Sequence, residues 1–189
     1  MKLGDIADVR MGYPFRSRLE HDPAGDVAVI QMKDIDDANL LHTEDAIKIS
    51  LPEGKGHHLI QEGDLVFRSR GRSNSVALVA ADIGEAVLAA PMLLIRPRKV
   101  LPAYLHWFIN LPATQANLAA LAEGTSVRMI SKEALLDMDV PVPSMARQRR
   151  IVDVARLAQR EQALMAGIAA QKKRLAEGIL MRYARKGSQ

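Results

Sequence analysis

Residues 68–75, which read Arg-Ser-Arg-Gly-Arg-Ser-Asn-Ser, carry the side chains best suited to chemistry on another molecule. An arginine guanidinium can donate two hydrogen bonds to guanine, an asparagine amide can pair with adenine, and serine hydroxyls suit phosphates. Glycine and serine are also typical of a plain loop, so the alternative is a solvated hairpin turn. The DNA-contacting residues predicted in this loop are Arg68, Arg70, Arg72 and Asn74.

Three further segments carry basic side chains that suit either a base edge or a phosphate. Residues 13–18, Tyr-Pro-Phe-Arg-Ser-Arg, form a second candidate loop. Gln31 and Lys33 follow a predicted strand, and Arg128 and Lys132 lie near a Gly-Thr-Ser turn. The additional predicted DNA-binding residues are Arg16, Arg18, Lys33 and Arg128.

The sequence offers no catalytic constellation. It has no glycine-rich phosphate loop, no GxGxxG and no motif for a methyl donor, and His57-His58 lacks metal-site spacing. The nearest nuclease-like match is Asp45 with Glu53-Gly54-Lys55, but the prolines and glycines around it favour a turn. We therefore predict a binding protein that has neither a catalytic residue nor a metal site.

The elements that must position these residues are mostly short strands in the first 100 residues. Apolar runs bounded by glycine and aspartate predict strands at residues 27–30, 64–67, 76–79, 86–89 and 92–95. Helices are predicted from Pro102, over residues 114–122 and after Ser131, which is a good N-cap. The spacing of Leu3, Ile6 and Val9 predicts a packed helical stripe at the start. The fold class is α+β.

From residue 146 onward the pattern is helical for nearly 40 residues, and we expect domains at residues 1–145 and 146–186. Residues 147–186 hold 11 Lys or Arg and 3 Asp or Glu, which gives this segment a net charge of +8. The net charge of the whole chain is +4, so the remainder carries a net charge of −4. A basic helix favours a polyanion or an acidic protein, and the alternative is a solvated face. The apolar seam, which predicts a partner helix, comprises Val154, Leu157, Leu164, Ile168, Leu175 and Ile179.

The composition sets broader bounds. The chain of 189 residues is long enough for one domain with an appendage, and it contains no cysteine, which excludes disulfides and fits a reducing cytosol. Its first residues have no apolar signal core, and the most apolar window, residues 76–95, is interrupted by Asp82, Glu85 and Pro91. We expect a cytoplasmic protein without a membrane span.

Four motifs, in this order and spacing, resemble the specificity subunit of type I restriction–modification systems. The opening Lys-Leu-Gly-Asp-Ile-Ala is followed by Gly12 and Phe15, and residues 63–66 read Gly-Asp-Leu-Val before Arg68 to Gly71. Tyr104-Leu105, Phe108 and Gln115 precede Gly-Thr-Ser-Val at 124–127 and Ile130-Ser131. Val-Pro-Val-Pro at 140–143 precedes Gln148 and Ile151. Apart from Arg68 and Arg70, which are predicted DNA contacts, we interpret these motif residues as scaffold.

The resemblance implies a target-recognition domain joined to a long helix that pairs as an antiparallel coiled coil. A full subunit has two of each, whereas this sequence has one, so it is either a half-subunit that forms a homodimer or a fragment of a longer chain. The implied function is non-catalytic recognition of a bipartite DNA target, which a homodimer would read as an interrupted palindrome. The alternative is a stand-alone DNA-binding regulator or decoy of such a complex.

The partners that the resemblance implies are double-stranded DNA, methyltransferase subunits and restriction motor subunits. The chain would need no cofactor of its own. The methyltransferase would use S-adenosylmethionine, and the motor would use ATP and magnesium.

Overall fold

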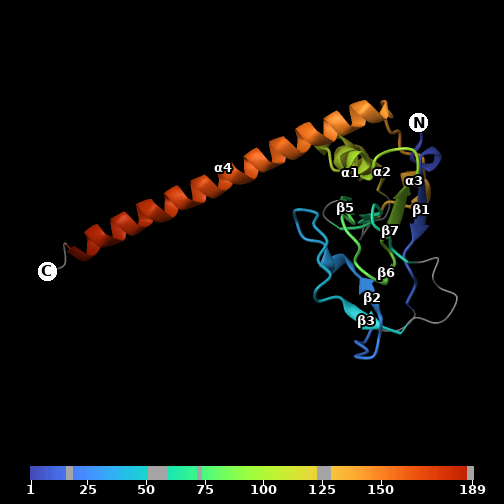
Figure 1. The fold of residues 1–189 in the computed structure, drawn as a ribbon, viewed down its shortest axis with the longest axis horizontal. Helices are drawn as coiled ribbons and strands as arrows, with labels where there is room; N and C mark the ends of the chain where they lie inside the picture. The colour runs from blue at the N-terminus through green and yellow to red at the C-terminus, as the bar shows by residue number, and fades with distance from the viewer. Residues whose placement is uncertain (16–18, 51–58, 72–73, 123–128, 187–189) are drawn as a thin grey trace. The chain divides into compact units, whose positions relative to one another are not determined.

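The computed structural model describes residues 1–15, 19–50, 59–71, 74–122 and 129–186. These residues form two compact units, Met1–Arg149 and Arg150–Gln189. The first unit, called the body below, is a mixed sheet-and-helix domain, and the second consists of most of one long helix (Figure 1). Within the described ranges, no helix combines the length and apolar character that crossing a bilayer requires.

A four-stranded antiparallel sheet organises one part of the body, with strand order β1-β7-β4-β5. The strands are β1 (Ala7–Met11), β4 (Leu65–Phe67), β5 (Val76–Leu78) and β7 (Leu93–Pro97). Strand β4 lies inside the sheet and its three residues are fully buried. A strand enclosed on both faces reads as a continuous apolar run, which is why its position was predictable from the sequence.

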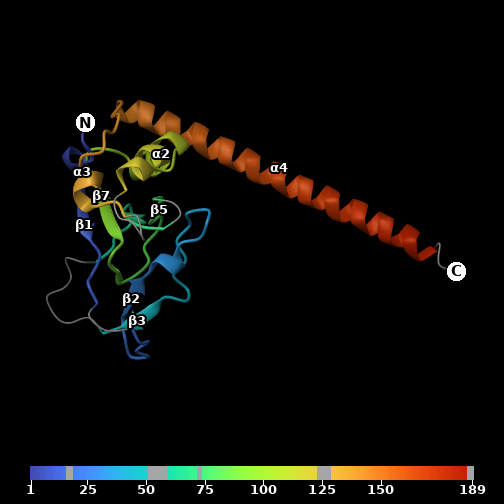
Figure 2. The ribbon, with the colours of Figure 1, turned by 180° about the vertical axis from the view of Figure 1, so that it is seen from behind.

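A second sheet of three strands has the order β3-β2-β6. It consists of β2 (Val27–Ile30), β3 (Ile47–Ile49) and β6 (Ala86–Leu88), with β2 antiparallel to β3 and parallel to β6. Figure 2 shows this sheet from behind, with β2 and β3 at the end of the body away from α3. An apolar cluster joins the two sheets, since Ile30 and Leu88 share it with Val66 and Leu94.

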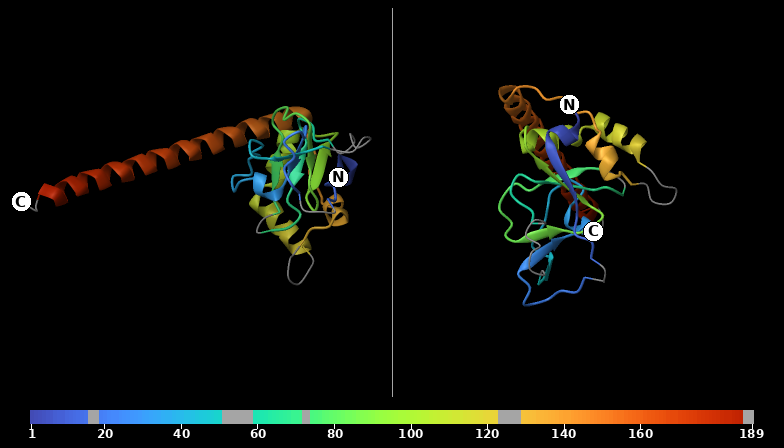
Figure 3. Two further views of the ribbon diagram at one scale, coloured as in Figure 1. Left: turned by 90° about the horizontal axis from the view of Figure 1, so that it is seen from below. Right: turned by 90° about the vertical axis from the view of Figure 1, so that its right-hand side faces the viewer.

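Among its described residues, the body also contains three short α-helices: α1 (Pro102–Ile109), α2 (Pro112–Leu121) and α3 (Lys132–Leu136). Proline opens α1 and α2, where its missing N–H costs nothing. The predicted N-cap Ser131 is confirmed, because its side chain accepts a hydrogen bond from the Ala134 amide at 3.1 Å. Figure 3 shows these helices from two further directions.

The start of the body is tied to its final segment. Leu3 N donates to Met138 O at 2.9 Å and Val140 N donates to Met1 O at 2.8 Å. The predicted helical stripe over Leu3, Ile6 and Val9 is wrong. A 3₁₀ turn, η1 (Leu3–Asp5), leads directly into β1, so Val9 is buried in a sheet. A spacing of three residues fits one helical face, but here it crosses a boundary between two elements.

The second unit belongs to α4, a 42-residue helix from Met145 to Lys186. All six residues of the predicted apolar seam lie on it and are exposed, from 45% at Ile179 to 68% at Leu157. At 100° per residue these side chains fall within about 80° of one helix face. The long C-terminal helix was predicted correctly, and its pairing with another helix remains a prediction.

Candidate nucleic-acid interface

The hairpin between β4 and β5 carries the loop that the sequence singled out, and much of that loop is held from within. Arg68 N donates to Ser75 O at 3.0 Å, which closes the loop at its base. Asn74 is only 9% exposed, and its amide nitrogen donates to Arg68 O and Ser69 O, each at 3.2 Å. Ser69 is buried and its hydroxyl donates to Pro91 O at 2.8 Å. The hydrogen bonds of Asn74 and Ser69 stabilise the loop, so neither side chain is presented to a ligand.

Arg68 also contacts the body itself. Its Nη2 donates to the carbonyl oxygens of Ile35 and Asp36, both at 2.6 Å, and thereby holds the segment that follows β2. Its Nε is buried and, among the described residues, has no hydrogen-bond partner. The predicted DNA contact by Arg68 would require these two carbonyl hydrogen bonds to break.

Arg70 and Lys33, by contrast, line a common pocket of about 740 Å³, which we call the Lys33–Arg70 pocket. Both side chains belong to exposed residues, although Lys33 follows a strand of one sheet and Arg70 follows a strand of the other. Lys33 lies in the 3₁₀ turn η2 (Met32–Asp34), and its Nζ is 2.6 Å from the buried carboxylate of Asp34. Gln31, which the sequence paired with Lys33, also lines the pocket. Residues that are 37 positions apart in sequence thus meet at one surface.

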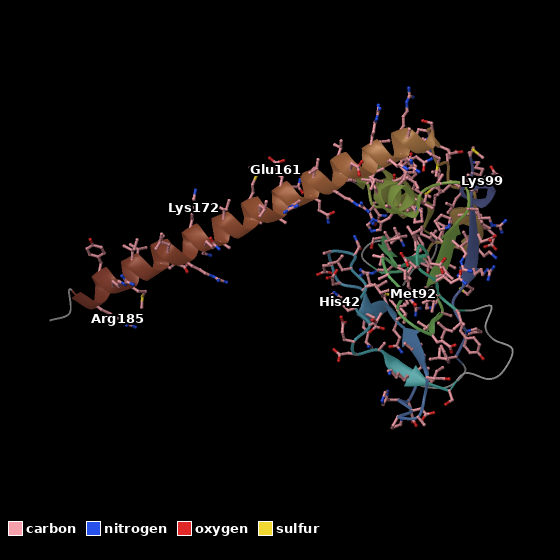
Figure 4. All side chains as sticks on the ribbon, viewed as in Figure 1. His42, Met92, Lys99, Glu161, Lys172 and Arg185 are labelled. Carbon is pink, nitrogen blue, oxygen red and sulfur yellow. The ribbon has the colours of Figure 1, made fainter. Side chains whose placement is uncertain are left out.

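Apolar side chains form the remaining wall of the pocket. Phe15 comes from the second predicted loop and Leu19 follows that loop, and Met92 and Pro91 come from the turn between β6 and β7 (Met92 is labelled in Figure 4). The rings of Tyr13 and Phe15 lie 4.7 Å apart. The pocket therefore combines two cations, one amide and an aromatic group, which is the set that nucleic-acid surfaces use for phosphates, base edges and stacking.

Gly12 explains how the Tyr13–Phe15 segment reaches this position. A Cβ at Gly12 would lie 2.6 Å from the backbone carbon of Ala89, so only glycine permits this approach. Tyr13 N then donates to Leu88 O at 2.6 Å, and Ala90 N donates to Tyr13 O at 3.0 Å. The glycine and the phenylalanine of the opening motif thus act together, the first by admitting the segment and the second by lining the pocket.

Four of the predicted DNA-binding residues lie outside the described residues. They are Arg16, Arg18, Arg72 and Arg128. Glu53-Gly54-Lys55 and His57-His58 lie outside them as well. Among the residues that are described, no group of three or more histidine, cysteine or acidic side chains is placed to hold a metal ion.

The polar motif residues hold the fold together, in agreement with their interpretation as scaffold. Asp64 is 1% exposed and accepts two hydrogen bonds from the Arg96 guanidinium, each at 2.7 Å. Gln148 is equally buried. It accepts from Leu101 N at 2.9 Å and donates to Pro143 O at 2.8 Å. Arg96 carried no sequence signal, because its partner is 32 residues away.

Two histidines outside the pocket have shifted pKa values with opposite signs. A hydrogen bond between His42 Nε2 and the Asp36 carboxylate, at 2.9 Å, raises the pKa of His42, and the same bond lowers the pKa of Asp36. Burial lowers the pKa of His106, and a backbone hydrogen bond with Val76 partly offsets this decrease. His42 is labelled in Figure 4.

A model of the type I restriction modification DNA specificity domain matches residues 1–171. No match was found among curated proteins. Solved structures with the same fold include the HsdS subunit from Thermoanaerobacter tengcongensis, with a TM-score of 0.63 and 20% identity over 86% of this chain. A chain from a study of complex assembly and conformational transition in the type I R-M system has a TM-score of 0.66 and 22% identity over 93%.

The type I restriction-modification S subunit from M. genitalium is also similar, with a TM-score of 0.58 and 12% identity over 88% of this chain. The matches cover 37%, 41% and 40% of those three chains, respectively. This chain therefore spans about two fifths of the length of its structural relatives, and at these identities the likeness describes the fold alone.

Proposed function

Because this chain belongs to the family of type I restriction modification DNA specificity domains, we propose that it is a sequence-specific DNA-binding module that directs a type I methyltransferase and restriction complex to its target. The observation that supports this most directly is the Lys33–Arg70 pocket, where cationic, amide and aromatic groups from three segments converge. The chain has no catalytic role in this proposal. It acts by selecting where partner subunits, with their own cofactors, carry out the reaction in the cytoplasm.

At the pocket, Arg70 is the proposed base-reading residue. It is exposed near the tip of the β4–β5 hairpin, and an arginine there can donate a forked pair of hydrogen bonds to guanine. Lys33 carries a compact positive charge that suits a phosphate, although Asp34 partly offsets that charge. Arg68 and Asn74 hold the loop in shape, so their contribution to DNA binding is indirect.

The target is proposed to be bipartite, with two half-sites read by two copies of the chain. The support comes from the exposed apolar seam of α4, since a helix of this length is stabilised by a partner helix. Antiparallel pairing of two copies would relate the bodies by a two-fold axis, so the recognised sequence would be an interrupted palindrome. Methyltransferase and motor subunits complete the proposed assembly.

The experiment is to sequence the methylated sites in cells that express this chain with its methyltransferase. We expect an interrupted palindrome for the unchanged chain. Arg70→Gln should weaken preference at one position of each half-site by about 1–3 kcal/mol. Lys33→Gln should weaken binding at all sites about equally, because phosphates are the same in every sequence.

Asymmetric half-sites would exclude the homodimer while leaving the recognition role intact. If both variants keep the unchanged methylation pattern and the unchanged salt dependence, the pocket is not the interface. A chain that binds DNA but never co-purifies with a methyltransferase subunit would instead be a stand-alone regulator or decoy.

A further inference from the structure

Four arginines form a straight row along α4. They are Arg156, Arg160, Arg174 and Arg185, and we call them the arginine row. Their separations of 4, 14 and 11 residues place all four within about 40° of one helix face at 100° per residue. The centre of this arc lies about 100° around the helix from the apolar seam. In Figure 4, Arg185 projects from one side of α4, while Glu161 and Lys172 project from the other.

The positions that share this arc are glycines. Between residues 150 and 186, helical periodicity places only Gly167 and Gly178 on the arc beside the four arginines. A glycine inside a helix is unfavourable, so its presence there calls for a reason such as close approach by a ligand. A Cβ at either glycine would have nothing within 4 Å, so packing within the chain does not supply that reason.

The row has no intramolecular partner in the part of the chain that the structure describes. All four arginines are exposed, and none of them pairs with a carboxylate there. The ion pair that does form on α4 joins Lys173 to Glu177 at 3.9 Å, away from the row. Pairing of two helices through the apolar seam would leave the row at the rim of the pair, so its charge would stay in water and available.

The composition of the arc indicates which kind of partner it fits. Protein interfaces depend on buried aromatic or large apolar anchors, and this arc contains none. Interfaces with DNA are strongly positive and polar, and guanidinium groups pair well with phosphates. The row extends over 29 residues, about 44 Å, which equals the length of about 13 base pairs.

We propose that the arginine row binds the phosphate backbone of duplex DNA, as a contact separate from the Lys33–Arg70 pocket. The contact carries no sequence information, because it consists of phosphates, and it adds affinity that salt weakens. The glycines allow a phosphate backbone to approach the helix closely between the arginines. This inference rests on the proposed DNA-binding function and assigns a second surface to it.

The test compares two variants of the full chain that lose the same charge. Arg156→Gln with Arg174→Gln removes charge from the row, and Lys172→Gln with Lys173→Gln removes it from positions more than about 100° away. Binding to a labelled duplex of random sequence, long enough to span the row, is measured by fluorescence anisotropy at several salt concentrations. Glutamine keeps the helix, which circular dichroism verifies.

In the row variant, the slope of log affinity against log salt should fall by about 0.9 for each phosphate that is no longer neutralised, or about 1.8 in total. The variant with Lys172→Gln and Lys173→Gln should change the slope far less. Arg156→Lys with Arg174→Lys should keep the slope of the unchanged chain, because lysine keeps the positive charge that neutralises a phosphate. Equal decreases in both glutamine variants, or no decrease in the row variant, would overturn the proposal while DNA binding itself stands.

Two other outcomes are decisive. Loss of methyltransferase co-purification by the row variant, with an unchanged salt slope, would assign the row to an acidic protein surface and overturn the DNA contact. If the unchanged chain binds neither this duplex nor its methylated target at any salt concentration, both this inference and the proposed function fail.

Discussion

At the scale of single residues, the most conspicuous arginines and asparagine of the sequence divide into two kinds. Arg68 and Asn74 are used by the backbone of their own loop and its neighbour, whereas Arg70 is exposed at the pocket. Residue type and spacing identified the loop, but hydrogen bonds to carbonyls 5 to 33 residues away decided the roles. Lys33 and Phe15 could not be linked to Arg70 from the sequence, because three separate segments supply them.

The buried ion pair of Asp64 and Arg96 gives a prediction at this scale. Asp64→Asn should reduce the free energy of unfolding by about 3 kcal/mol, because it leaves the Arg96 charge partly buried without a counter-charge. Urea unfolding followed by circular dichroism measures the change. Asp8→Asn is the matched control, since Asp8 pairs with a mostly exposed Arg98 and should cost less than about 1 kcal/mol. Equal effects in the two variants would contradict the structural role of Asp64.

At the scale of elements, the sequence was most informative where a continuous apolar run or a helix-opening proline marks the element. Strand β2 and the start of α1 were predicted at the residues where they occur, and β4 to within one residue. Strands β1 and β3 were missed. Strand β3 has three residues with an exposed Lys48 at its centre, so it offers too short an apolar pattern to stand out.

His106 on α1 gives a prediction about pH, because burial lowers its pKa. Above about pH 6.5, the histidine is neutral in both the folded and the unfolded chain, so its contribution to stability is fully present. As the pH falls below that value, the unfolded chain takes up a proton before the folded chain does. Stability should therefore decrease, by at most about 1.4 kcal/mol per pH unit, until the folded pKa is passed.

Urea unfolding between pH 7 and pH 5 checks this, and His106→Gln should flatten the dependence. His42→Gln is the control of opposite sign. The pKa of His42 is raised by Asp36, so that pair stabilises the fold below about pH 6.5 and its contribution disappears as pH rises through the folded pKa. A His106→Gln variant that keeps the full loss of stability on acidification would contradict the assignment.

At the scale of the whole molecule, α4 was predictable as a helix because its pattern is long and regular, but the sequence alone does not determine what covers the seam. The structure leaves the seam residues exposed, and the homodimer proposal accounts for that exposure. A charge within the seam should therefore disrupt self-association and leave the body folded.

Leu164→Glu with Ile168→Glu should raise the dissociation constant of the proposed dimer by about a hundredfold or more, since it places charges in an apolar contact. Sedimentation velocity over a range of concentrations measures this. Leu180→Glu is the matched control, because Leu180 is 67% exposed but lies about 120° from the seam centre. If the unchanged chain stays monomeric at every concentration, the homodimer proposal is wrong.

The hydrogen bonds that tie Met1 to Val140 and Leu3 to Met138 have a consequence for how such a body can be used. The chain enters and leaves the body at adjacent points, and domains with this property tolerate insertion into longer chains and exchange between them. A polypeptide can therefore carry this body twice in tandem, or carry a related body in its place, without a change in the path of any strand. The hydrogen bonds that stabilise the body thus also make it a unit that can be transferred between chains.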